Sequence, residues 1–125
     1  MVSWRLEWYI LFSDNFYSRL CENWSPAKML GTAQRVHFSF HYGETPKSRD
    51  YRGAPRWNPT DPVTIRIDKD AKSGVHMHYA GKDHIPESQV TGCNIKDIPL
   101  FEFLRIMLEH RRSNKTFNDL LDFQI

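Results

Sequence analysis

Histidines are the residues of this chain with the most obvious chemistry. Three of the six, His76, His78 and His84, fall in the stretch GVHMHYAGKDHIP, residues 74–86. Imidazole ligates metal ions, and it also exchanges protons near neutral pH. Residues i and i+2 of a β-strand point to the same side, so His76 and His78 would share one surface. Because exposed strand positions are often polar, a histidine pair without any chemistry is a third interpretation.

A metal site would need ligands from more than one strand. The imidazoles that could join one shell are those of His37, His41, His76 and His78. The nearest carboxylates are those of Asp68 and Asp83, and neither Cys21 nor Cys93 is close in sequence. The sequence therefore leaves a metal site open, but we expect no metal ion or other cofactor.

Metal-free cleavage of RNA is the interpretation that we favour. Imidazoles can take a proton from a ribose 2′-hydroxyl and give one to the leaving 5′-oxygen, while Arg or Lys stabilises the additional charge on the phosphate. The predicted catalytic residues are His41, His76 and His78. The predicted phosphate or RNA contacts are Arg35, His37, Arg52, Arg66 and Lys82. The rings predicted to stack on unpaired bases are Tyr51, Trp57 and Tyr79.

Several of these residues have a plainer interpretation. Tyr79 has the strand parity of Met77, so it is equally suited to the core. The arginines within residues 49–56 are also typical of a solvated loop. His84 follows the strand, between Gly81 and Pro86, and we expect it to lie outside the site.

Three stretches occur in a familiar order before a C-terminal helix: FSFHY (38–42), YRGAP (51–55) and HMHY (76–79). This order resembles the TumE-like toxins of prokaryotic toxin–antitoxin pairs, and the likeness covers roughly residues 35–110. The resemblance implies a small cytoplasmic α+β ribonuclease with RNA as substrate and a cognate antitoxin as partner. It points to His41, Arg52, His76 and His78.

The composition is compatible with these expectations. With 125 residues, 40% hydrophobic and 14% aromatic, the chain is expected to form a single domain over residues 1–125. Its net charge of +2 neither requires nor excludes nucleic acid. The apolar run Trp8–Phe12 is too short to cross a bilayer, so we expect no membrane partner and no signal peptide. Two reduced thiols are expected in the cytoplasm.

Alternating apolar and polar residues predict the strands that must position the site. The predicted strands are 4–12, 16–23, 35–42, 63–68 and 75–79. The first segment also fits a helix, which would gather Trp4, Trp8, Leu11 and Phe12 on one side. The faces of the third strand separate Val36, Phe38, Phe40 and Tyr42 from Arg35, His37, Ser39 and His41. The last two strands form a hairpin in which we pair Ile67 with Val75, Arg66 with His76 and Thr64 with His78. A proline-containing loop, residues 43–62, adjoins this surface.

Helices are predicted at two places. Ser25-Pro26 is a helix-start signal, and Gly31 would end a short helix. Near the C-terminus, an apolar stripe of Ile98, Phe101, Leu104, Met107 and Leu108 predicts a helix capped by Asp97. Ser113-Asn114 would end it, and a last short helix would follow. The fold class is therefore α+β: an antiparallel sheet with a C-terminal helix packed on its apolar face.

Two other functions remain open. One is a non-catalytic binding or interaction protein, such as a phage or plasmid accessory factor, and the other is a histidine-rich metal-binding protein. The RNA target and the oligomeric state have no signal in the sequence.

Overall fold

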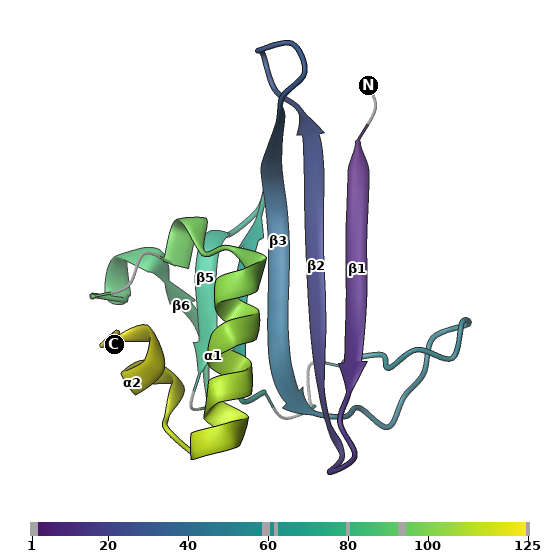
Figure 1. Cartoon of the computed structure of the whole chain (residues 1–125), viewed down its shortest axis with the longest axis vertical. Helices are drawn as coiled ribbons and strands as arrows, with labels where there is room; N and C mark the ends of the chain where they lie inside the picture. Colours follow the sequence, from purple (N-terminus) through teal and green to yellow (C-terminus); the bar gives the residue numbers. More distant parts are fainter. Residues whose placement is uncertain (1–2, 59–60, 62, 80, 93–94, 125) are drawn as a thin grey trace.

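A computed structural model describes residues 3–58, 61, 63–79, 81–92 and 95–124. Its strands form one antiparallel sheet in the order β1-β2-β3-β4-β5-β6, followed by the helices (Figure 1). The strands are β1 (Trp4–Leu11), β2 (Phe16–Pro26), β3 (Ala33–Glu44), β4 (Ile65–Asp70), β5 (Gly74–Tyr79) and β6 (Lys82–Pro86). Two 3₁₀ turns, η1 (Glu87–Gln89) and η2 (Ile95–Asp97), precede α1 (Leu100–Ser113) and α2 (Phe117–Leu121). The α+β class is confirmed.

The core lies on one face of the central strands. Phe40, Ile65, Ile67 and Met77 are fully buried there, as expected from their alternation with polar residues. Figure 1 shows α1 crossing the sheet beside β3 and β5, while no helix lies in front of β1 and β2 in that view. The exposed aromatic side chains of Trp4 and Trp8 lie on β1.

The helix predicted after Ser25-Pro26 is wrong. β2 continues through Pro26, which pairs with Ala33 of β3. The chain between them is a hairpin loop, in which the N–H of Ala27 donates to the carbonyl of Thr32 over 3.1 Å. Gly31 supports the turn with a φ of +80°, a conformation that glycine adopts without steric cost. Pairing with a whole neighbouring strand outweighs a weak local helix signal.

The apolar stripe predicted for the C-terminal helix is confirmed in part, because Ile98 and Met107 are buried and Leu104 packs against the core. The buried side chains of α1 are Leu100, Phe103, Ile106 and Met107. Phe101 and Leu108 of the predicted stripe are 77% and 48% exposed. The helix also begins two residues later than predicted, with Pro99 rather than Asp97 as its N-cap. Apolar residues occur on two overlapping sides of α1, and the side that contains Phe103 is the one that contacts the sheet. The ring centroids of Phe103 and Phe40 lie 5.5 Å apart.

The end of α1 follows the prediction. Asn114 caps the helix in the left-handed conformation at φ 58°, which asparagine tolerates better than most residues. α2 then begins after Thr116, whose side chain accepts a hydrogen bond from the N–H of Asp119. None of the described helices is long and apolar enough to cross a membrane.

The loop predicted over residues 43–62 is confirmed from residue 45 onward for its described residues, which form an irregular connection with an isolated bridge between Arg49 and Pro55; residues 43 and 44 belong to β3. Cys21 is a buried free thiol. Pro62, Cys93 and the side chain of Asp83 lie outside the described part of the chain.

Candidate functional site

The strand register aligns the candidate residues on the face of the sheet opposite the core. Directly opposed residues of antiparallel strands share a face. One row across β1–β5 contains Tyr9, Arg19, His41, Arg66 and His78. The next row contains Glu7, Cys21, Ser39, Asp68 and His76. His41, Arg66, His76 and His78 thus lie on one surface.

The predicted hairpin partners are nevertheless wrong by two residues. Arg66 lies opposite His78, and Asp68 lies opposite His76. β4 continues to Asp70, two residues beyond its predicted end, and pairs there with Gly74, so the turn contains only residues 71–73. Asp70 Oδ1 accepts the N–H of Lys72 at 3.0 Å and of Ser73 at 2.6 Å. A shift of two residues leaves every side chain on its predicted face.

His41 is buried within the site. Its Nδ1 lies 3.3 Å from the Tyr17 hydroxyl, and the Trp57 ring meets the imidazole edge-on at a centroid distance of 6.1 Å. Burial and the charge of Arg66 lower the pKa of His41 to about 3, so this imidazole is neutral at pH 7. Burial raises the pKa of Tyr17 to about 12, so its hydroxyl keeps its proton.

A cavity of about 320 Å³ opens beside His41, between β1–β4 and the loop after β3. Its arginines are Arg5, Arg19, Arg52, Arg56 and Arg66, and its carboxylates are Glu7 and Asp50. His41 and Trp57 complete the inner wall. Their buried Nε2 and Nε1 atoms have no hydrogen-bond partner among the described residues. The lining thus combines an excess of positive charge with two buried polar atoms that lack a hydrogen-bond partner.

Glu7 organises the arginines of this cavity. Its carboxylate accepts from Arg5 at 3.0 Å and from Arg52 at 3.2 Å, and it lies 3.7 Å from Arg19. Burial would raise the pKa of Glu7, but hydrogen bonds from Tyr9 and Arg5 and the nearby arginine charges lower it to about 2. The sequence analysis did not select Arg5, Glu7 or Arg19. Their common parity on β1 and β2 was the signal that could have indicated them.

Asp68 links the cavity to the histidines of β5. Its Oδ2 lies 2.8 Å from Arg66 Nε, 3.4 Å from His76 Nε2 and 3.6 Å from His78 Nε2. Burial would raise the pKa of Asp68, but hydrogen bonds from both histidines and the Arg66 charge hold it well below its usual range. The hydrogen bond to Asp68 raises the pKa of His76.

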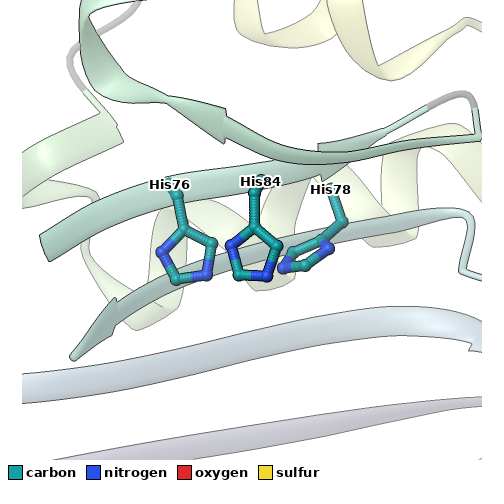
Figure 2. Close-up of side chains that lie close together, drawn as sticks. All are labelled: His76, His78 and His84. Carbon is teal, nitrogen blue, oxygen red and sulfur yellow. The ribbon is translucent and has the colours of Figure 1, made fainter. Parts of the chain in front are cut away.

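The expectation that His84 lies outside the site is wrong. Its ring is 4.9 Å from that of His76 and 5.0 Å from that of His78, and Figure 2 shows His84 between them. The cause is β6, which the sequence analysis missed. Met77 pairs with Ile85 on the core face, so the neighbouring residue of β6, His84, lies on the opposite face with the histidines of β5. The buried Ile85 after Gly81 was the available signal.

The predicted position of Arg35 is also wrong. β3 has a bulge, because Asn23 pairs with His37 but Trp24 pairs with Arg35. The bulge turns Arg35 to the core face, where its guanidinium lies 4.2 Å from the Phe38 ring centroid and 3.0 Å from Glu22 Oε2. Arg35 is therefore separated from His37 and His41 by the sheet.

The other predicted residues have different positions. His37 and Asp68 line a smaller cavity of about 250 Å³ on the site face. Tyr79 packs on the core face, where its hydroxyl donates to Asn118 over 3.1 Å and its ring contacts Phe123. Tyr51 is 96% exposed on the loop. Trp57 lies under Arg66, whose guanidinium is 4.7 Å from its ring centroid.

Lys82, the last predicted RNA contact, is exposed at the beginning of β6.

Comparisons of the chain with protein-family models, with curated proteins and with solved structures find no match.

Proposed function

We propose that this chain binds RNA and cleaves its phosphodiester bonds on the polar face of the sheet. The observation that carries the proposal is the arginine-lined cavity, which continues through Arg66 and Asp68 to His76 and His78. Metal-free RNA cleavage requires phosphate binding and proton transfer, and the residues suited to these two roles lie next to each other here.

The cavity is suited to an RNA phosphate. Five arginines against two carboxylates leave three positive charges in excess. The unpartnered Trp57 Nε1 is a hydrogen-bond donor. When the Tyr17 hydroxyl donates to His41 Nδ1, His41 Nε2 carries the proton and becomes a second donor. We therefore assign His41 to phosphate binding, because a pKa of about 3 makes it a poor proton carrier at pH 7.

Proton transfer is assigned to His76 and His78. In its neutral form His78 takes the proton of a ribose 2′-hydroxyl, whose oxygen attacks the phosphorus. Protonated His76, with its pKa raised by Asp68, donates to the leaving 5′-oxygen as the P–O5′ bond breaks. The products are a 2′,3′-cyclic phosphate and a 5′-hydroxyl. Arg66, directly opposite His78, is placed to stabilise the additional negative charge on the phosphate.

The resemblance to TumE-like toxins supports a biological role for this activity. We propose a cytoplasmic toxin whose cognate antitoxin covers the polar face and blocks the cavity. We also infer that α1 packs on the apolar face of the sheet, since Phe103, Ile106 and Met107 belong to the same buried cluster as Phe40 and Ile67. That packing leaves the opposite face for RNA.

The test compares two arginines of similar exposure. Arg52 lies at the cavity and pairs with Asp50, while Arg105 lies on α1 and pairs with Glu102; their side chains are 50% and 59% exposed. Arg52→Gln should weaken binding of a labelled single-stranded RNA about tenfold, the loss expected for one charge-assisted phosphate contact. Arg105→Gln should leave the affinity unchanged. Fluorescence anisotropy measures both.

Cleavage is tested on the same RNA in the presence of EDTA. The wild-type chain should yield 2′,3′-cyclic phosphate ends, and the double variant His76→Ala, His78→Ala should yield none. RNA left intact by the wild-type chain would overturn the catalytic proposal. If binding still depended on Arg52, the chain would then be an RNA-binding protein without catalysis.

A further inference from the structure

Three histidine rings gather at one point on the site face. His76 and His78 come from β5 and His84 from β6, and each pair of ring centroids is separated by 4.9–5.2 Å. One nitrogen from each ring lies within 4.8 Å of the other two. Figure 2 shows all three rings side by side, on the same side of the strands.

The surroundings hold two of these rings in place. His76 Nδ1 lies 3.2 Å from the carbonyl oxygen of Gly74. If a proton on Nδ1 is donated to this carbonyl, a metal ion can take the place of the Nε2 proton that His76 otherwise donates to Asp68. Metal-ligating histidines commonly have this arrangement, in which the second nitrogen donates to a backbone carbonyl or a carboxylate. Asp68 Oδ2, at 3.4 Å from His76 Nε2 and 3.6 Å from His78 Nε2, supplies an anionic oxygen beside the cluster.

We propose that His76, His78 and His84 bind one divalent transition-metal ion of the zinc class. Imidazole nitrogens suit zinc, copper and nickel, whereas Ca²⁺ and Mg²⁺ need oxygen ligands. Three histidines leave the fourth position of a tetrahedral ion open to water or to Asp68.

The cluster needs only a small adjustment to hold the ion. With Zn–N bonds of about 2.0–2.1 Å, the nitrogens of a tetrahedral site lie about 3.4 Å apart, so shifts of about 1 Å bring the rings to ligating distance. His84 has the freedom for this movement, since it is the exposed member of the cluster. His76 and His78 are buried and supply the fixed side of the site.

Metal binding has a consequence for RNA cleavage. A bound ion occupies nitrogen lone pairs of His76 and His78, so it prevents the proton transfer assigned to them. Zn²⁺ is therefore expected to inhibit cleavage. This inhibition rests on the proposed function, while metal binding itself does not.

The binding test uses Zn²⁺ and the full chain after removal of metals with EDTA and dialysis. Isothermal titration should give one ion per chain, and the melting temperature should rise with Zn²⁺ concentration. The variant His84→Asn should lose at least tenfold in Zn²⁺ affinity. Asparagine is suitable because residue 84 has a φ of +51°, which asparagine tolerates.

The matched control is His37→Asn, which removes a histidine from the same face but outside the cluster. It should bind Zn²⁺ as the wild type does. Equal Zn²⁺ affinity in the His84→Asn variant, or no Zn²⁺ effect on the wild-type chain, would overturn the metal site. A chain that binds Zn²⁺ through His84 but leaves RNA intact would retain the metal site and lose only the proposed function.

Discussion

His41 shows how burial changes the role of a residue. Taken alone, a histidine in the motif FSFHY on a polar strand face is a reasonable general base. In the folded chain it is only 2% exposed, beneath the ring of Trp57. Removing the imidazole from water disfavours its charged form, so a base at the surface becomes a neutral hydrogen-bonding group inside.

The depressed pKa of His41 predicts a loss of stability at low pH. The groups that act on it are Arg19, Arg66, His78 and Asp68, and only Asp68 raises its pKa. The folded imidazole has a pKa of about 3 and the unfolded one about 6.5, so protonation between these values favours unfolding. The contribution to stability is complete above pH 6.5 and falls with decreasing pH by up to roughly 1.4 kcal/mol per unit.

The variant His41→Gln tests this prediction, because glutamine takes up no proton. Between pH 7.5 and pH 5, wild-type stability should fall about 2 kcal/mol more than that of the variant. Urea unfolding at the two pH values measures the difference. Equal losses of stability in the wild-type chain and the variant would show that His41 does not cause the pH dependence.

One strand irregularity and one additional strand determine which side chains belong to the site. The bulge in β3 moves Arg35 to the core face, and the pairing of β6 with β5 brings His84 to the site face. Strict alternation along β3 predicts the opposite for Arg35. One additional residue in a strand reverses the side to which the following side chains point. The place of that additional residue depends on pairing with the neighbouring strand.

The side of α1 that is buried can be tested directly. Phe103 is fully buried against Phe40, whereas Phe101 is 77% exposed. Phe103→Ala should lower the free energy of unfolding by about 3–5 kcal/mol, because it removes a large buried ring. Phe101→Ala should change it by about 0.5 kcal/mol or less. Urea unfolding of both variants checks the assignment, and similar losses would contradict the observed phase.

At the scale of the whole molecule, the two faces of the sheet carry different kinds of side chain. The core face carries the apolar cluster, to which α1 and α2 contribute Phe103 and Phe117. The site face carries the cavity arginines and the histidines. A net charge of only +2 conceals this arrangement, because it does not show that five arginines line one cavity against two carboxylates.

Concentrated charge predicts salt-dependent RNA binding. For single-stranded RNA, the logarithm of the association constant should fall with the logarithm of salt concentration by about 0.7 for each phosphate contacted. Arg52→Gln should reduce this slope by about 0.7, and Arg105→Gln should not change it. Anisotropy titrations between about 50 and 200 mM salt measure the slopes. An affinity independent of salt would exclude the cavity as a phosphate site.

Local sequence patterns predict the fold class, most of the strands and the face on which His41, Arg66, His76 and His78 lie. These features follow from alternation, which fixes the direction of the side chains in a regular strand. The folded chain was needed to place His84 with His76 and His78, to separate Arg35 from them, and to show that Glu7 contacts arginines of β1, β2 and the loop. Bulges, register and burial arise from contacts between segments that are distant in sequence, and no local pattern contains those contacts.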